Sequence, residues 1–262
     1  MNNQPEIFPC DERRDLIIAG NREGTFQFCA MHFMEIANKA IKEHGFFSVA
    51  LSGGSTPKGI FSLLASPEYS SKIEWSKVLL FWSDERSVSS DSPDSNYHMA
   101  MNAGFDKLGI LKENVFRMVA ETEIEENAQR YEQIILEKLP GASFDLVMLG
   151  MGDDGHTASL FPHTKGLHVQ KKLVTANYIP SQQTWRLSLT FDCINAAKAI
   201  AIYVIGKGKQ QKLKEVFTHS YDPEQLPIQK IGTQEHRALW ILDLEAAEAL
   251  LTILGNSLNE QE

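Results

Sequence analysis

One segment of this 262-residue chain gathers the residue types that acid–base chemistry needs. Directly after the apolar run 146–149, residues 150–156 contain three glycines, two aspartates and one histidine. Glycine lets backbone N–H groups approach a ligand closely and adopts φ angles that other residues resist. Histidine is the side chain whose ordinary pKa of ~6.5 lies nearest to neutrality. The pattern predicts a buried strand that ends in a glycine turn and presents His156 as a proton acceptor, with the Asp154 carboxylate holding the imidazole in one tautomer.

Two other chemistries have weaker support. The two aspartates and His156 could ligate a metal, but the nearest second imidazole, His163, lacks the H-x-x-x-H spacing of a helical zinc site. Covalent catalysis by Ser55 or Cys193 is disfavoured, because the chain has no G-x-S-x-G motif and Cys193 has no adjacent base. We therefore favour a general base over a metal or a nucleophile.

A second glycine pattern, S-G-G-S-T-P at residues 52–57, lies between a predicted strand and a predicted helix. Free N–H groups and the positive end of a helix dipole at such a junction can bind phosphate. A tight turn closed by a Thr56 cap explains the pattern equally well. The G-x-x-x-x-G-K-[ST] and G-x-G-x-x-G spacings are both absent there, which disfavours ATP and NAD as ligands.

Cations lie at the ends of three predicted strands. Arg86 ends the sequence W-S-D-E-R, Arg186 begins a strand, and Lys207 and Lys209 follow another. A chain with a net charge of −9 needs such a local cluster to hold a phosphate dianion, and each charged hydrogen bond contributes ~1.5–3 kcal/mol. We interpret Glu85 as a solvated loop charge.

Composition narrows the class of protein. With 43% hydrophobic and 23% charged residues, the chain is typical of a globular protein, and we predict a single domain over residues 1–262. The net charge of −9 argues against nucleic acid or an anionic membrane as partner. The chain shows neither a signal peptide nor an apolar stretch of the ~18–20 residues that a membrane span needs, so a cytoplasmic location is expected. Cys10, Cys29 and Cys193 form no C-x-x-C pair, and we expect small buried hydrophobic residues rather than a disulfide or zinc site.

Strand and helix patterns alternate along the chain. Several strands are continuous apolar runs, as expected when helices cover both faces of a mainly parallel sheet, and the prediction is a three-layer α/β fold. Strands are predicted at 15–20, 46–51, 78–82, 115–119, 144–149, 173–176, 186–189, 199–205 and 238–242. Helices are predicted after an Asn21 cap, from Thr56-Pro57 onward, and at 96–108, 124–139, 210–218 and 244–254.

Three segments together resemble the 6-phosphogluconolactonase family: S-G-G-S-T-P at 52–57, W-S-D-E-R at 82–86, and G-M-G-D-D-G-H-T-A-S-L-F-P at 150–162. The resemblance implies hydrolysis of 6-phospho-D-glucono-1,5-lactone to 6-phosphogluconate, the second step of the oxidative pentose phosphate pathway. It implies a modified Rossmann-like sheet, no metal, no organic cofactor, a phosphosugar lactone as the partner, and a monomer or weak homodimer.

The resemblance also implies roles for individual residues. Position by position, these are a general base (His156), its neighbouring carboxylate (Asp154), a loop that cradles the substrate (Gly53, Gly54, Ser55, Thr56) and cationic ligands (Arg86, Arg186, Lys209). The chain departs from the family pattern at Asp153 and over residues 227–237, and Lys207 is a second candidate for the lysine.

Two alternatives share this fold. A sugar-phosphate deaminase-isomerase, such as a glucosamine-6-phosphate deaminase, carries a glutamate shortly after its catalytic histidine, in the sequence G-H-I-A-F-N-E-P. The matching stretch 155–162 here has no acidic residue after His156. A non-catalytic sugar-phosphate sensor of a transcription regulator normally adds a DNA-binding helix-turn-helix, for which no segment is evident.

Overall fold

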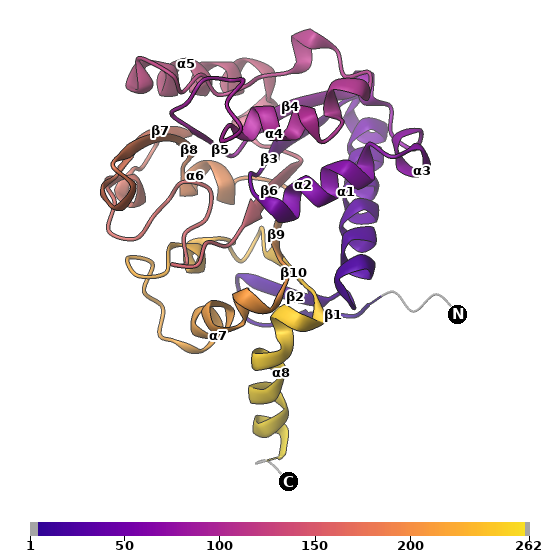
Figure 1. Cartoon of the computed structure of the whole chain (residues 1–262), viewed down its shortest axis with the longest axis vertical. Helices are drawn as coiled ribbons and strands as arrows, with labels where there is room; N and C mark the ends of the chain where they lie inside the picture. Colours follow the sequence, from indigo (N-terminus) through magenta and orange to yellow (C-terminus); the bar gives the residue numbers. More distant parts are fainter. Residues whose placement is uncertain (1–4, 260–262) are drawn as a thin grey trace.

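The computed structural model describes residues 5–259, with side chains described through residue 252. Within this range ten strands form two sheets (Figure 1). The strands are β1 (Ile7–Pro9), β2 (Arg14–Ile18), β3 (Phe47–Leu51), β4 (Val78–Trp82), β5 (Asp84–Arg86), β6 (Leu146–Gly150), β7 (Val174–Ile179), β8 (Thr184–Leu189), β9 (Ile200–Val204) and β10 (Ala238–Leu242). The helices are α1 (Arg22–His44), α2 (Ser55–Leu64), α3 (Pro67–Ser70), α4 (Asn96–Asn102), α5 (Ile124–Lys138), α6 (Phe191–Asn195), α7 (Gln210–Thr218) and α8 (Leu244–Asn259).

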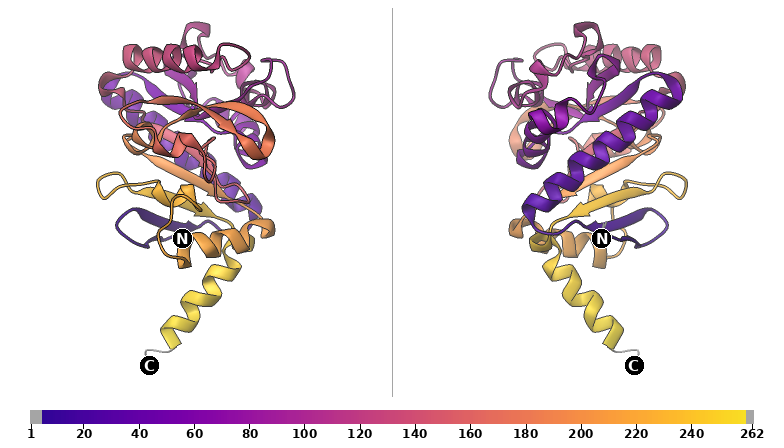
Figure 2. Two further views of the ribbon diagram at one scale, coloured as in Figure 1. Left: turned by 90° about the vertical axis from the view of Figure 1, so that its left-hand side faces the viewer. Right: turned by 90° about the vertical axis from the view of Figure 1, so that its right-hand side faces the viewer.

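The main sheet has the strand order β1-β2-β10-β9-β6-β3-β4. Every neighbouring pair is parallel except β1 and β2. All residues of β3 and β9 are buried. This explains why β9 is a continuous apolar run and why β3 is apolar apart from Ser48, whose hydroxyl donates to Asp145 Oδ2. Figure 2 shows α1 crossing one face of this sheet and the β7–β8 ribbon crossing the other. The predicted α/β class, with a mainly parallel sheet and covered faces, is confirmed.

A second, antiparallel sheet has the order β5-β8-β7. The predicted strands 173–176 and 186–189 exist, but they belong to this small sheet rather than to the main one. Its third strand, β5, has the sequence Asp-Glu-Arg and pairs with β8 in the register Asp84 to Ser188 and Arg86 to Arg186. No strand was predicted at residues 84–86, because three consecutive charged residues show no apolar alternation.

Some element boundaries also differ from the prediction. Residues 115–119 form no strand, because Val115 makes one isolated bridge to Leu80 before the chain turns away from β4. The helix predicted at 96–108 ends at Asn102, and Gly104, at φ +114°, separates it from a 3-10 turn. Helix α2 begins at Ser55 with Gly54 as its cap, rather than at a Thr56 cap.

The predicted cap of α1 is confirmed, whereas the prediction of buried cysteines holds for two of the three. The Asn21 side chain caps α1 by accepting a hydrogen bond from Gly24 N at 2.9 Å, as predicted. Cys29 and Cys193 are buried, whereas Cys10 is exposed because it follows the edge strand β1. No helix in the described part of the chain combines the length and apolar character that a membrane crossing requires.

Candidate active site

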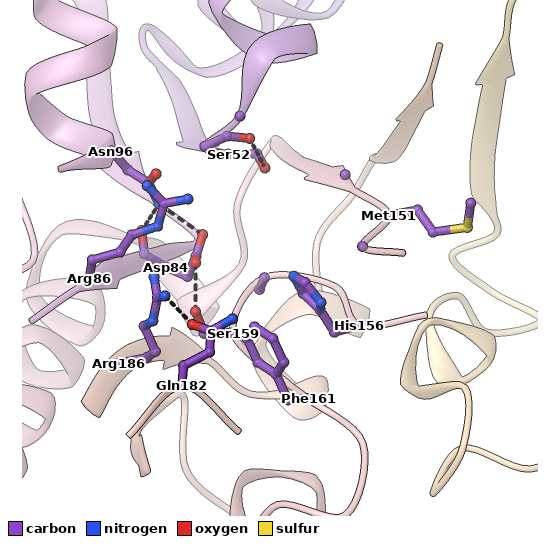
Figure 3. A pocket seen from close by; sticks show the side chains of 15 residues that line it. Ser52, Asp84, Arg86, Asn96, Met151, His156, Ser159, Phe161, Gln182 and Arg186 are labelled. Carbon is purple, nitrogen blue, oxygen red and sulfur yellow. Dashed lines mark hydrogen bonds between the residues drawn. The ribbon is translucent and has the colours of Figure 1, made fainter. Parts of the chain in front are cut away.

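A pocket of about 240 Å³ lies where the loops after β3 and β6 meet the β5–β8 ribbon (Figure 3). The carboxyl ends of neighbouring parallel strands form this edge of the main sheet, which is where open α/β sheets bind ligands. The pocket is lined by Ser52, Gly53, Gly54, Asp84, Arg86, Asn96, Gly150, Met151, Gly152, His156, Ala158, Ser159, Phe161, Gln182 and Arg186.

The turn after β6 carries His156, as the glycine pattern predicted. Gly152 N donates to His156 O at 2.9 Å, and Gly155 N donates to Gly152 O at 3.1 Å. Gly155 has a φ of +86°, and a Cβ atom there would lie 2.7 Å from Leu226 Cδ2. Only glycine fits this position without strain. The turn therefore returns the chain tightly enough to place His156 in the pocket wall.

His156 and Asp154 form a hydrogen-bonded pair. The distance from His156 Nδ1 to Asp154 Oδ1 is 2.6 Å, and the same oxygen accepts from His156 N at 3.0 Å. Partial burial acts to raise the pKa of Asp154, but the hydrogen bond and the charge of His156 outweigh it, so this pKa lies below its ordinary value. An ionised Asp154 accepts a hydrogen bond from Nδ1–H, which keeps the proton on Nδ1 and leaves the lone pair of the neutral imidazole on Nε2.

The Phe161 ring stacks on one face of the His156 imidazole. The two rings stack with centroids 3.8 Å apart and planes inclined by 18°. Phe161 is itself buried, so it fixes one face of the ring while the other remains toward the pocket. Within residues 5–259, no three histidine, cysteine, aspartate or glutamate side chains are grouped closely enough to hold a metal ion.

Gly152→Ala is expected to displace this imidazole and abolish most of the activity. The added Cβ would lie 2.1 Å from His156 Nδ1, whereas the backbone of Gly152 has no positive φ that alanine would resist. Stability should change little while kcat falls, as measured by thermal unfolding and steady-state kinetics. Gly24→Ala is the matched control, since its Cβ would meet no atom closer than 3.4 Å. Full activity in Gly152→Ala would show that the position of this ring does not matter.

Strand β5 directs its side chains alternately to two sides, as a strand must. Asp84 and Arg86 line the pocket, whereas Glu85, 3% exposed, points the other way toward the start of α4. The Glu85 carboxylate accepts hydrogen bonds from Arg86 N, Asn96 N, Tyr97 N and Ser95 Oγ at 2.8–2.9 Å. Our interpretation of Glu85 as a solvated charge is therefore wrong, because the three donors from residues 95–97 tie the start of α4 to β5.

Burial raises the pKa of Glu85, and its hydrogen bonds only partly counter this. Glu85→Gln is nevertheless expected to destabilise the protein, because an amide nitrogen cannot accept from the donors that one carboxylate oxygen now serves. Each buried donor left unpaired costs about 1–3 kcal/mol. Urea unfolding measures the effect, with the exposed Glu113→Gln as control. A more stable Glu85→Gln variant would mean that the cost of burying the charge exceeds the value of these hydrogen bonds.

Two arginines face each other across the β5–β8 ladder. Arg86 and Arg186 are directly paired in register and both line the pocket. Burial, and then the charge of Arg86, lower the pKa of Arg186. Within the described chain, the buried Nε atoms of both arginines lack a hydrogen-bond partner. Like charges in directly opposed positions repel, so the pair is suited to an anion.

Other predicted binding residues lie at the margin of the pocket. Lys209 Nζ donates to Met151 O at 2.9 Å and pairs with Asp153 Oδ1 at 2.6 Å. Lys209, rather than Lys207, therefore contacts the turn after β6. The wall includes Gly53 and Gly54, whereas Ser55 and Thr56 belong to the first turn of α2 and do not line the pocket.

Several residues of the pocket wall were not predicted from the sequence. Ser159 and Phe161 lie within the 150–162 motif, whereas Asp84 could be assigned to the pocket only once residues 84–86 were seen to form a strand. Gln182, which accepts a hydrogen bond from Arg186 Nη2, had no signal. It lies in the turn between β7 and β8, whose place beside the pocket depends on the tertiary structure.

The fold and the site together define a class: an α/β enzyme whose pocket combines a hydrogen-bonded histidine–aspartate pair with two arginines suited to a small anionic ligand. Residues 20–240 match the family of glucosamine-6-phosphate isomerases/6-phosphogluconolactonase, and the chain belongs to this family. A 6-phosphogluconolactonase from Chlamydia pneumoniae is 43% identical over 211 residues, which are 80% of each chain. One from Synechocystis sp. is 42% identical over 218 residues, covering 81% of this chain and 88% of its own. The crystal structure of 6-phosphogluconolactonase from Thermotoga maritima has a TM-score of 0.75 at 28% identity, covering 87% of this chain and 98% of that one.

Proposed function

We propose that the protein hydrolyses 6-phospho-D-glucono-1,5-lactone to 6-phosphogluconate, with His156 as general base. The observation that carries the proposal is the His156–Asp154 pair in the wall of a pocket that also contains Arg86 and Arg186. The family and the names of the relatives above support the choice of substrate.

The chemistry proceeds through two proton transfers. Nε2 of His156 takes a proton from water as the water oxygen attacks the lactone carbonyl carbon, C1. General-base help of this kind is worth ~10²–10⁴-fold in rate. Arg186 or a backbone N–H of the glycine turns stabilises the developing oxyanion, which is worth ~3 kcal/mol. The C1–O5 bond then breaks, the ring oxygen takes the proton from the imidazolium, and Asp154 stabilises the imidazolium while it exists.

The phosphate of the substrate supplies binding rather than bond breaking. Arg86, Lys209 and the pocket-lining residues 52–54 hold the dianion and so place the distant carbonyl near His156. Lactone hydrolysis involves no change of oxidation state and needs only proton transfer and charge stabilisation, so the proposal assigns no metal or organic cofactor. We also propose a monomer or weak homodimer and a cytoplasmic location, the latter in keeping with a sugar phosphate as substrate.

A coupled assay tests the proposal. Glucose 6-phosphate is oxidised to fresh lactone, and the rate of acid production is followed with and without the protein. We expect clear acceleration over spontaneous hydrolysis, and its absence would refute the proposed function. Ammonia release from glucosamine 6-phosphate would instead identify a deaminase-isomerase, and tight phosphosugar binding without turnover would identify a sensor.

A further inference from the structure

Asp84 is a pocket carboxylate that the proposed mechanism does not use. It is only 6% exposed, yet it lines the pocket. Its oxygens accept from Ser159 Oγ at 2.7 Å, Asn96 Nδ2 at 3.2 Å and Ser83 Oγ at 3.5 Å, and no cation of residues 5–259 forms an ion pair with it. A buried carboxylate without a counter-ion is unfavourable unless hydrogen bonds satisfy it.

Asp84 lies in the same pocket as Arg86 and Arg186. The Asp84 charge favours the protonated form of Arg186 beside it. A carboxylate there also opposes the binding of an anionic substrate, so phosphate binding gives no reason for it. An ionised carboxylate accepts hydrogen bonds at about four lone-pair positions. The hydrogen bonds from Ser159 Oγ and Asn96 Nδ2 occupy two of these positions. Because Asp84 lines the pocket, further positions are available to a donor on a ligand. The matching donors on a sugar are its hydroxyl groups.

Neighbouring elements hold Asp84 rigidly. Asn96 Nδ2 donates to both the backbone O (2.8 Å) and the carboxylate of Asp84, and Asn96 is itself buried at the start of α4. Asn96 packs on Gly53, where a Cβ atom would lie 1.9 Å from Asn96 Oδ1. Ser159, also buried, comes from the catalytic turn. Figure 3 shows Asp84 between the arginines and the His156–Phe161 pair, held by Asn96 and Ser159.

We propose that Asp84 is a specificity-determining residue that accepts a hydrogen bond from a ring hydroxyl of the sugar. The inference rests on the proposed function: with the phosphate and the carbonyl at separate places in the pocket, the ring hydroxyls between them face Asp84. A site built to bind a hydroxyl discriminates strongly against an analogue that lacks it, because the buried acceptor is then left unpaired.

A double-mutant cycle between protein and substrate tests this role. kcat/KM is measured for wild type and Asp84→Asn with the phosphorylated gluconolactone and with its 2-, 3- and 4-deoxy analogues. We expect wild type to lose about ten- to a hundred-fold with one deoxy lactone, the range for a charged hydrogen bond. Asp84→Asn should lose a similar factor with the parent lactone but little more with that analogue. Asp106→Asn, the same change at an exposed site, should behave as wild type.

Other outcomes overturn the inference. Equal losses for every deoxy lactone in wild type and Asp84→Asn would show that no hydroxyl contacts Asp84, and a lower KM in Asp84→Asn would show that the carboxylate only repels the substrate. If Asp84→Asn does not fold, Ser159→Ala is the second variant. It keeps the carboxylate but removes the 2.7 Å donor that positions it, so the loss with that one deoxy lactone should be smaller than in wild type. If wild type hydrolyses the parent lactone but no coupling appears between the Asp84→Asn change and a missing hydroxyl, only this inference is refuted. If wild type does not hydrolyse the parent lactone, the proposed function is refuted as well.

Discussion

His156→Ala is expected to lower kcat by ~10²–10⁴-fold while KM changes little, because the variant loses the proposed general base and keeps the cations proposed to bind the substrate. The imidazole forms its contacts with Asp154 and with the Phe161 ring, and none with Arg86 or Arg186. Its removal therefore leaves the arginine pair intact. Steady-state kinetics with the coupled lactone assay measures both constants, and thermal unfolding checks the fold.

Asp154→Asn is the informative companion of this variant. It keeps the imidazole but replaces the carboxylate that accepts from Nδ1, so kcat should fall by less than in His156→Ala. Since the pKa of Asp154 is lowered, its carboxylate stays ionised as the pH falls to its ordinary value of 3.8 and below. Protonation of Asp154 should therefore not account for a loss of wild-type activity in mildly acidic solution. Unchanged kcat with a raised KM in His156→Ala would contradict the general-base role.

The main sheet was predictable because its strands carry a strong signal. The strands Val78–Trp82 and Ala238–Leu242 match their predictions at both ends, and β3 begins one residue later than predicted. Buried parallel strands are largely apolar, which makes their ends readable in the sequence. The small sheet has no such signal. Strand β5 is three charged residues long, and its partner β8 lies about a hundred residues further along the chain. Only the tertiary structure brings these two strands together.

The candidate site could be predicted in part for the same reason. Glycine-rich segments at strand ends pointed to 52–54 and 150–156, and the topology of a parallel sheet brings such ends together. The side to which each residue of β5 points was not predictable, because that region was not recognised as a strand. This is why Glu85 was misinterpreted and why Asp84, on the pocket side, was overlooked.

Arg86→Ala is expected to raise KM by about ten- to a hundred-fold and to change kcat much less, because one charged hydrogen bond contributes ~1.5–3 kcal/mol. Arg86 is already positioned for an anion. Its Nη1 donates to Asp94 O at 2.6 Å, which holds the guanidinium in place, while its buried Nε has no partner within the described chain. Lys209→Ala should also raise KM, but Lys209 must first leave Asp153 to reach the substrate, so we expect a smaller effect.

The substrate itself provides the control for Arg86. With unphosphorylated gluconolactone, the difference in kcat/KM between wild type and Arg86→Ala should nearly vanish, because the lost contact is to the phosphate. Arg86→Lys should recover only part of the binding, since an ammonium group cannot reproduce the planar fork of a guanidinium. A fall in kcat that persists with the unphosphorylated lactone would instead place Arg86 at the oxyanion. The phosphate would then depend on Arg186 and Lys209, and the carbonyl would lie at the Arg86 side of the pocket.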